Sequence, residues 1–294
     1  MGKMVIGLGE VLWDDFGTYR KLGGAVTNFA VHAARLGMES WVISAIGHDD
    51  SGKEAARELQ SKGVMTHLSR VDFPTGTVSV IPHVDRETEY DIRYPSAWDF
   101  IPFTDELVTL ARKTDAVCFG TLAQRNPTSR DTIRRFIEEM PPGDAALKVF
   151  DANLRQTFWD ERVIRYSMSL CNILKISDSE YPQFRAIFGL DENPITGCRQ
   201  MLKGFSLKMV LLTCGADGSS VFTQFGESHL PAAKVDVVDT VGAGDSFTAA
   251  FTCAILNGRN ICEAHGLAVR TSAFVCSREG ATPELPETLR NAIL

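Results

Sequence analysis

The stretch WVISAIGHDDSGKEAARELQSKG, residues 41–63, indicates the class of fold. Residues 41–47 are an apolar run of the kind that forms a buried strand. Residues from Ser51 to Lys62 show helical spacing, and Gly63 follows as a helix stop. A strand followed by a helix is the repeating unit of parallel sheets, so the stretch predicts an α/β protein.

The same alternation continues on both sides of this unit. Further strands are expected in apolar runs at residues 4–9, 115–120, 147–152, 172–177 and 208–214. Helical patterns lie between most of these runs, and one covers residues 23–37. We therefore expect a single α/β domain over residues 1–294, with a mostly parallel central sheet and helices on both faces.

Two segments depart from this alternation and predict a second, small sheet. Residues 12–22 and about 67–98 have β character, as in GTVSVIPHV and ETEYDIRY, and neither contains a helical pattern of its own. We expect these segments to form a lid of β-strands that projects from the main domain. A surface hairpin without a function is the alternative.

Composition and charge restrict the partners and the location of the protein. A net charge of −7 argues against a nucleic-acid partner, because binding to the phosphate backbone needs a basic surface. No stretch approaches the ~20 apolar residues of a membrane helix, and the apolar N-terminal run is too short for a signal peptide. The seven scattered cysteines form no CxxC pair and predict free thiols. We expect a cytoplasmic protein with no nucleic-acid or membrane partner.

The segment GHDDSGKE, residues 47–54, nearly matches the phosphate-binding pattern GxxxxGK[ST]. Glu54 stands where that pattern needs a hydroxyl group for Mg²⁺, and Asp49 and Asp50 would place negative charge in a phosphate cradle. The segment instead predicts a turn whose acidic residues cap the next helix. A dinucleotide-binding fold also has weak support, because no GxGxxG follows the first strand.

The strongest chemical signal is DTVGAGDSFTAAFTCAIL, residues 239–256. Gly242, Ala243 and Gly244 leave the backbone bare just before a helix, which predicts an anion site made of unpaired N–H groups and the positive helix end. Asp245 follows in the first turn of that helix. A proton acceptor beside a phosphate site is what phosphoryl transfer to an alcohol requires. A glycine-rich turn with Asp245 as an ordinary helix-start residue is the alternative for GAGD alone.

This segment resembles the C-terminal signature of the ribokinase-like (PfkB) sugar kinases, and GGAVTNFAVHAARLG, residues 23–37, resembles their N-terminal signature. The resemblance covers essentially the whole chain. Within the family the chain is similar to the bacterial fructokinases in GEVLWD (9–14), YPSAWD (94–99), FGTLAQR (119–125) and FDANLRQTFW (150–159). The resemblance implies a ribokinase-like fold and an ATP-dependent sugar kinase, with D-fructose as the expected substrate and fructose 6-phosphate as the product.

The resemblance also implies roles for individual residues. Asp245 corresponds to the catalytic base, and the N–H groups of Gly242, Ala243 and Gly244 correspond to the anion hole. The residues expected at the sugar are Asp14, Gly23, Gly24, Asn28, Trp98, Asn153 and Arg155. The residues expected at the nucleotide are Thr213, Gly215 and Gly218.

Several of these residues also have an ordinary structural interpretation. Asp14 can be a turn residue, and Asn28 a polar residue at the start of a helix. Arg155 can pair with a surface carboxylate instead of neutralising phosphate charge. Trp98 can anchor the lid rather than stack on a sugar ring, and the anchor is slightly favoured. The TCGADG segment that holds the nucleotide candidates can be a plain hairpin turn.

The resemblance implies two metal sites. Glu180 matches the family's NxxE motif, which organises Mg²⁺ through water, but Ser177 stands where the motif has asparagine. Mg²⁺ is expected in any case, because the phosphates of ATP need a counter-charge. A K⁺ ion near the anion hole is a further possibility, with Asp239 and the carbonyl groups of Val241 and Gly280 as its ligands.

Other functions stay open on the sequence. The substrate can be ribose, 2-keto-3-deoxygluconate, a nucleoside or a phosphosugar, and the last would need cations such as Arg20, Lys21, Arg93 or Arg125 near the sugar. A sugar-binding protein that has lost catalysis is a different class, which only Ser177 favours. A dehydrogenase would lack its fingerprint glycines. A homodimer that forms through the lid is expected from the resemblance.

Overall fold

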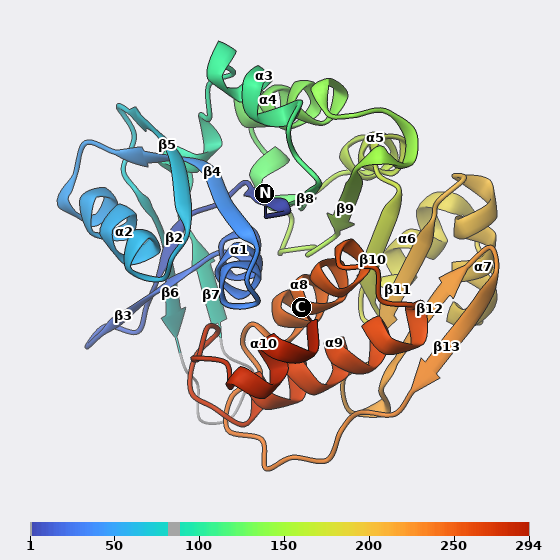
Figure 1. Ribbon diagram of the computed structural model, residues 1–294. Coiled ribbons are helices and arrows are strands. Elements are labelled where there is room, and N and C mark those ends of the chain that lie inside the picture. The colour runs from blue at the N-terminus through green and yellow to red at the C-terminus, as the bar shows by residue number, and fades with distance from the viewer. Residues whose placement is uncertain (1, 82–88, 294) are drawn as a thin grey trace.

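The computed structural model describes residues 2–81 and 89–293, and its main feature is a nine-stranded sheet (Figure 1). The strand order is β13-β12-β11-β10-β9-β8-β1-β4-β5, and neighbours pair in parallel from β11 to β5. β12 and β13 extend the sheet as antiparallel strands. The bounds are β1 (Met4–Leu8), β4 (Glu39–Gly47), β5 (Met65–Val71), β8 (Ala116–Phe119), β9 (Leu147–Asp151), β10 (Ile173–Ser177), β11 (Met209–Thr213), β12 (Ser219–Thr223) and β13 (Gly226–Leu230).

Helices cover both faces of this sheet, as the sequence predicts (Figure 1). One face packs against α3 (Asp105–Ala111), α4 (Pro127–Glu139), α5 (Glu161–Leu170), α6 (Tyr181–Phe188) and α7 (Pro194–Gly204). The other packs against α1 (Ala25–Arg35), α2 (Asp50–Ser61), α8 (Ala243–Leu256), α9 (Ile261–Cys276) and α10 (Glu287–Ile293). The central strands β1, β8, β9, β10 and β11 are therefore buried on both faces, which explains why they are mostly apolar rather than alternating.

A second sheet of four strands stands beside the first, in the order β3-β2-β6-β7. Its strands are β2 (Leu12–Asp15), β3 (Arg20–Gly23), β6 (Gly76–Ile81) and β7 (Glu89–Ile92). This confirms the prediction of a small second sheet, although part of the expected segment, residues 82–88, lies outside the described residues.

The bounds expected for the second segment of this sheet, about 67–98, are wrong at both ends. Residues Met65–Val71 form β5, which pairs in parallel with β4 at the edge of the main sheet and so completes a strand–helix–strand unit with α2. Residues Ala97–Asp99 form a short 3₁₀ turn after β7. The β character of 65–71 is real, but only the tertiary structure decides which sheet the strand joins.

The turn at residues 47–54 caps a helix, as predicted. Asp49 is the N-cap of α2, and its Oδ1 atom accepts a hydrogen bond from the amide of Gly52 at 2.8 Å. Its Oδ2 atom accepts another from the amide of Thr75, also at 2.8 Å. Asp49 therefore connects the end of β4 to the segment that leads into the small sheet. Within residues 2–81 and 89–293, no helix has the length and apolar character to cross a membrane.

Candidate active site

The GAGD segment forms the start of α8, as predicted. α8 begins at Ala243, and Gly242 precedes it in the left-handed region with φ 76°. A Cβ atom on Gly242 would lie 2.5 Å from the carbonyl oxygen of Ala281, so this position needs glycine for its backbone angle and for its close contact. The tight turn orients the first amide groups of α8 out of the helix end.

The three amides expected in the anion hole are not equivalent. The Ala243 amide donates to the carbonyl of Thr240 at 3.2 Å, so it already has a partner in the turn. Among the described residues, the amides of Gly242, Gly244 and Asp245 have no such partner in a turn or loop. The amides at this helix end without such a partner are therefore those of Gly242, Gly244 and Asp245, whereas the amide of Ala243 is engaged in the turn.

Asp245 lies in the first turn of α8 and contacts α1. Its Oδ2 atom accepts a hydrogen bond of 2.8 Å from Nδ2 of Asn28, although the two residues are 217 positions apart. Both side chains are buried, and Figure 1 shows α1 and α8 side by side. The other amide atom of Asn28, Oδ1, is buried and has no partner within the described residues. The pair therefore combines a carboxylate with a free acceptor, which suits the recognition of a hydroxyl group.

The environment of Asp245 changes its acidity. Burial raises the pKa of this carboxyl group to about 7, and the negative charge of Asp151 acts in the same direction. The hydrogen bond from Asn28 and the positive charges of Lys175 and Arg155 lower the pKa again, but by less. A carboxylate with a pKa near the working pH is well suited to take a proton and return it.

A buried ion pair lies directly behind the start of α8. Nζ of Lys175 on β10 is 3.1 Å from Oδ1 of Asp151 on β9, and Oδ2 of Asp151 accepts a hydrogen bond from Thr248 of α8. A Cβ atom on Gly244 would come within 3.2 Å of the Lys175 ammonium group. Neither residue was among the predicted site residues, although a lysine and an aspartate inside apolar strands were a signal for the pair.

The expected sugar residues Asp14, Gly23 and Gly24 lie together near the ends of β2 and β3. A Cβ atom on Gly23 would overlap Oδ2 of Asp14, and one on Gly24 would lie 2.5 Å from the carbonyl oxygen of Glu10. Burial raises the pKa of Asp14 to about 6, and the charge of Arg155 opposes this rise. The glycines therefore allow the carboxylate and the backbone to pack closely at the start of α1.

Glu10 is a further buried carboxyl group that the sequence analysis did not single out. It is 3% exposed, and its Oε1 atom accepts a hydrogen bond of 3.0 Å from the amide of Ala25 at the start of α1. Its Oε2 atom is buried without a partner among the described residues. Burial raises the pKa of Glu10, and the charge of Arg155 acts against it. Its place after the first strand, within GEVLWD, was the available signal.

Arg155 and Asn153 lie in the loop that follows β9. Nη2 of Arg155 donates to Oδ1 of Asn153 at 3.2 Å, and Asn153 has a positive φ of 42°. Arg155 is exposed, and its charge lowers the pKa values of both Asp14 and Asp245. The loop therefore brings a cation to the side of the site where the expected sugar residues meet α8.

Trp98 is placed as an anchor of the small sheet. Its side chain is 1% exposed, and the guanidinium group of Arg125 lies 3.9 Å from the centre of its ring. A Cβ atom on Gly76, the first residue of β6, would contact the same ring. The ring is covered by protein, so the geometry favours the anchoring role over stacking on a sugar.

The expected nucleotide residues occupy the turn between β11 and β12. Gly215 and Gly218 have φ values of 51° and 101°, and Thr213 is the last residue of β11. The carbonyl of Thr213 accepts a hydrogen bond of 2.9 Å from the amide of Asp178, which follows β10. The turn between β11 and β12 and the turn of residues 178–180 after β10 are therefore neighbours. Both lie at the carboxyl ends of parallel strands, where α/β proteins bind ligands.

Comparison with known proteins agrees with this geometry. The sequence pattern of the pfkB family carbohydrate kinases matches residues 14–288. The chain belongs to this family. It is thus a carbohydrate kinase, which transfers a phosphoryl group to an alcohol, and the predicted ribokinase-like fold and family are confirmed.

Similar proteins within this family are named for different substrates. An ATP-dependent 6-phosphofructokinase of Thermoanaerobacterium thermosaccharolyticum is 30% identical over 96% of this chain and 91% of its own length. A fructokinase of Escherichia coli is 29% identical over 90% of this chain and 88% of its own length. The crystal structure of a Vibrio cholerae fructokinase bound to fructose, ADP and calcium matches with a TM-score of 0.80, at 24% identity, covering 99% of both chains.

Glu180 has a geometry that fits a water-mediated role toward Mg²⁺. Its Oε1 atom accepts one hydrogen bond, from the amide of Leu154 at 2.8 Å. Its Oε2 atom accepts two, from the amide and the hydroxyl group of Ser177 at 2.7 and 2.9 Å. A carboxylate oxygen can accept about two hydrogen bonds, so Oε1 can take one more from a metal-bound water. Ser177, which replaces the expected asparagine, holds Glu180 in place through its own hydroxyl group.

Asp239 brings together the residues expected around a monovalent cation. Its Oδ1 atom accepts a hydrogen bond from the amide of Val241 at 3.0 Å, and Oδ2 accepts one from the amide of Gly280 at 2.9 Å. Within the part of the chain that the structure describes, no three His, Cys, Asp or Glu side chains gather as a metal cage.

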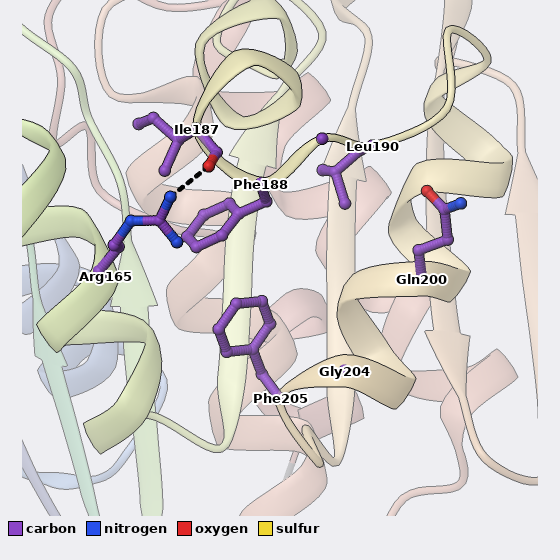
Figure 2. Close-up of a pocket in the computed structure, with 8 residues that line it drawn as sticks. Arg165, Ile187, Phe188, Leu190, Gln200, Gly204 and Phe205 are labelled. Carbon is purple, nitrogen blue, oxygen red and sulfur yellow. Dashed lines mark hydrogen bonds between the residues drawn. The ribbon is translucent and has the colours of Figure 1, made fainter.

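A separate groove of about 510 Å³ lies between the ends of α5, α6 and α7 (Figure 2). Arg165 crosses it and donates a hydrogen bond to the carbonyl of Ile187, and Phe188 and Phe205 form its apolar wall. None of the residues expected at the sugar, the nucleotide or the anion hole lines this groove. The groove is therefore distinct from the candidate active site around α8.

Proposed function

We propose that this protein is an ATP-dependent kinase of a neutral sugar, with D-fructose as its substrate and Asp245 as its catalytic base. The observation that carries the proposal is the buried contact between Asn28 and Asp245 at the start of α8, beside the Gly242 and Gly244 amides. It joins a hydroxyl-binding amide, a proton acceptor and an anion site. The fructokinases among the relatives support fructose as the sugar.

Two of the four cations considered for a phosphosugar are engaged by other parts of the protein. Arg20 pairs with Glu54 and stacks on Trp13, and Arg125 pairs with the buried Asp99. These two cations are thus committed to the protein, whereas a phosphosugar would need free cations at the sugar. Because the exposed Arg155 also lies at this site, the choice of a neutral sugar rests on the fructokinases among the relatives. Fructose 6-phosphate stays in the test as a second substrate because a 6-phosphofructokinase is 30% identical to this chain.

The reaction follows from the arrangement of the side chains. In this proposal the sugar lies between Asp14, Gly23, Gly24 and Asn28, with one hydroxyl group against Asp245. Asp245 accepts the hydroxyl proton while the sugar oxygen forms a bond to the γ-phosphorus of ATP. The bond from that phosphorus to the β–γ bridging oxygen breaks, and ADP leaves. The amides of Gly242 and Gly244 stabilise the charge on the phosphoryl oxygens.

The remaining residues bind the nucleotide and its charge. ATP would lie along Thr213, Gly215 and Gly218, which are next to the Glu180 turn. Mg²⁺, held by the phosphates and by water on Glu180, would neutralise phosphate charge. Asp239, Val241 and Gly280 would surround a K⁺ ion, and Arg155 and Asn153 would contact the sugar or the phosphoryl group. A lid role for the small sheet, pairing of two copies through it and a cytoplasmic location stay predictions.

A coupled ADP-release assay with ATP and Mg²⁺ tests the proposal. The substrates to compare are fructose, ribose, glucose, 2-keto-3-deoxygluconate, fructose 6-phosphate and adenosine. Strong turnover with fructose alone supports the proposal, and preferential turnover of fructose 6-phosphate would replace it with a phosphosugar kinase. If no sugar reacts while calorimetry detects sugar binding, the protein is a sugar-binding relative without catalysis.

A further inference from the structure

We infer that His32 is a positioning residue for the anion hole, acting through the loop of residues 279–284. The inference rests on the proposed function, because it assigns a role in the same phosphoryl transfer. Among the described residues, the hydrogen bond that the His32 ring makes goes to the loop and not to an expected sugar or nucleotide residue. His32 lies on α1, four residues after Asn28 and therefore on the same face of that helix.

His32 holds the loop through one hydrogen bond. Its side chain is completely buried, and Nε2 is 2.9 Å from the carbonyl oxygen of Ala281. A carbonyl group can only accept, so Nε2 carries the hydrogen atom. Burial lowers the pKa of His32 to about 4, which keeps the ring neutral at physiological pH. Nδ1 is buried and has no hydrogen-bond partner among the described residues. Within the described residues, the ring therefore makes its hydrogen bond to Ala281.

The loop that His32 holds touches the anion hole. Ala281 packs so closely on Gly242 that a Cβ atom there would lie 2.5 Å from the Ala281 oxygen and 2.7 Å from its Cα. Gly242 in turn sets the left-handed turn that frees the amides at the start of α8. A shift of Ala281 away from Gly242 would therefore remove the support behind this turn.

Other contacts hold the same loop from either side. Arg35, also on α1, donates to the carbonyls of Thr282 and Pro283. The amide of Gly280 donates to Asp239 at 2.9 Å. Among these contacts, His32 is the one that binds Ala281, the residue against Gly242. One face of α1 thus orients the base through Asn28 and supports the phosphoryl site through His32.

The test compares His32→Leu with His32→Gln. Leucine fills the space without a donor, whereas the amide nitrogen of glutamine can take the place of Nε2. We expect His32→Leu to lower kcat/KM for ATP about tenfold, as for the loss of one net hydrogen bond, and to leave the sugar dissociation constant within about twofold. His32→Gln should recover most of the lost activity.

A matched control is Ser40→Ala. Ser40 on β4 is buried, and its hydroxyl group donates to the carbonyl of Ala30 on the same helix at 2.7 Å. The change removes one buried hydrogen bond to α1 that does not involve the loop, so it should lower stability without changing kcat/KM for ATP. Hydrogen exchange gives a readout without turnover: the amides of residues 279–284 should exchange faster in His32→Leu than in the wild type or in Ser40→Ala.

The inference is overturned if His32→Leu keeps wild-type kcat/KM, if His32→Gln loses as much as His32→Leu, or if exchange in 279–284 does not change. If His32→Leu does not fold, His32→Gln is compared with His32→Asn, whose shorter side chain cannot reach Ala281. Equal activities of these two variants would then contradict the inference. A wild-type protein inactive on every sugar would refute the proposed function instead, and hydrogen exchange would still decide the role of His32.

Discussion

Asp245 is the residue at which burial, charge and hydrogen bonding meet. Its carboxyl group is buried, lies near Asp151 and accepts a hydrogen bond from Asn28. The first two effects favour the protonated form and the third favours the carboxylate. Because burial dominates, the group can change its protonation state near neutral pH, which an exposed aspartate cannot do.

We predict that Asp245→Asn lowers kcat by about 10²–10⁴, the usual contribution of a positioned base, while sugar binding survives. The change has nearly the same shape, so loss of binding is not expected. Steady-state kinetics and sugar calorimetry on the same preparation measure the two effects. A variant with near-normal turnover would refute the assignment of the base.

The same variant should be more stable than the wild type at alkaline pH. The pKa of Asp245 is raised in the folded protein to about 7, against an ordinary value of 3.8. The folded state therefore binds this proton more tightly, and stability falls as the pH rises from about 4 to about 7. Asparagine does not ionise, so Tm should exceed that of the wild type at pH 8 by several degrees and should be nearly equal at pH 4.

Turnover of the wild type should depend on pH through Asp245. Because the base works as a carboxylate, kcat/KM should rise with pH and level off above about 7. Asn28→Leu removes a hydrogen bond that lowers this pKa, so the rise should move to higher pH. The measurement is kcat/KM between pH 5 and 9 for both proteins. If Asn28→Leu does not shift the pH dependence of kcat/KM, a group other than Asp245 controls that dependence.

At the scale of elements, the start of α8 depends on contacts between three segments. Gly242 turns the chain into the helix, Ala281 packs behind it, and α1 holds both the base and the loop. The Lys175–Asp151 pair lies under the same first turn and ties it to β9 and β10. The helix end proposed to bind the phosphoryl group is thus fixed by its neighbours rather than by its own capping side chain.

Gly242→Ala tests this arrangement against Gly258→Ala. The two glycines have similar φ values, 76° and 79°, but a Cβ atom meets Ala281 at Gly242 and nothing within 4 Å at Gly258. In both variants, the cost of placing alanine in the left-handed region should lower the free energy of unfolding by about 1 kcal/mol. Only Gly242→Ala should also lower kcat, by about 10²-fold, because the anion-hole donors move. The measurements are denaturant unfolding and steady-state kinetics of both variants. Equal kcat values for Gly242→Ala and Gly258→Ala would argue against a role for the close contact with Ala281.

At the scale of the whole molecule, a buried ion pair joins the small sheet to the main domain. Nε of Arg125, after β8, is 2.7 Å from Oδ1 of Asp99, after β7, and the guanidinium group lies over the rings of Tyr94, Trp98 and Phe158. Arg125 also donates to the carbonyl of Arg93. Phe158 belongs to the segment that carries Arg155, so the joint connects the small sheet to a loop of the site.

We predict that Arg125→Met lowers the free energy of unfolding by about 3–5 kcal/mol, because it leaves the buried Asp99 without its partner. Arg112→Met is the matched control. Its partner is Glu139, both side chains are largely exposed, and such a pair contributes at most about 1 kcal/mol. Denaturant unfolding of the three proteins measures the difference. Equal losses would show that the joint does not stabilise the fold.

The sequence alone determined the class of fold and predicted where the chemistry takes place. Strands and helices follow from periodicity over ten or so residues, so the parallel sheet was readable from runs such as 41–47 and 208–214. The candidate anion site could be predicted for the same reason, since Gly242, Gly244, Asp245 and the helix after them are contiguous. The match of both signatures to the family then implied Asn28, which the contact with Asp245 supports.

Only the tertiary structure decided which distant residues meet. Which sheet the strand at residues 65–71 joins depends on pairing with β4, and local β character is the same for either sheet. The roles of Glu10 and Lys175 depend on burial and on partners from other strands. His32 could not be singled out from the sequence, because a contact 249 residues away leaves no trace in local spacing. Local patterns fix elements, whereas packing between elements fixes the charges and contacts of the site.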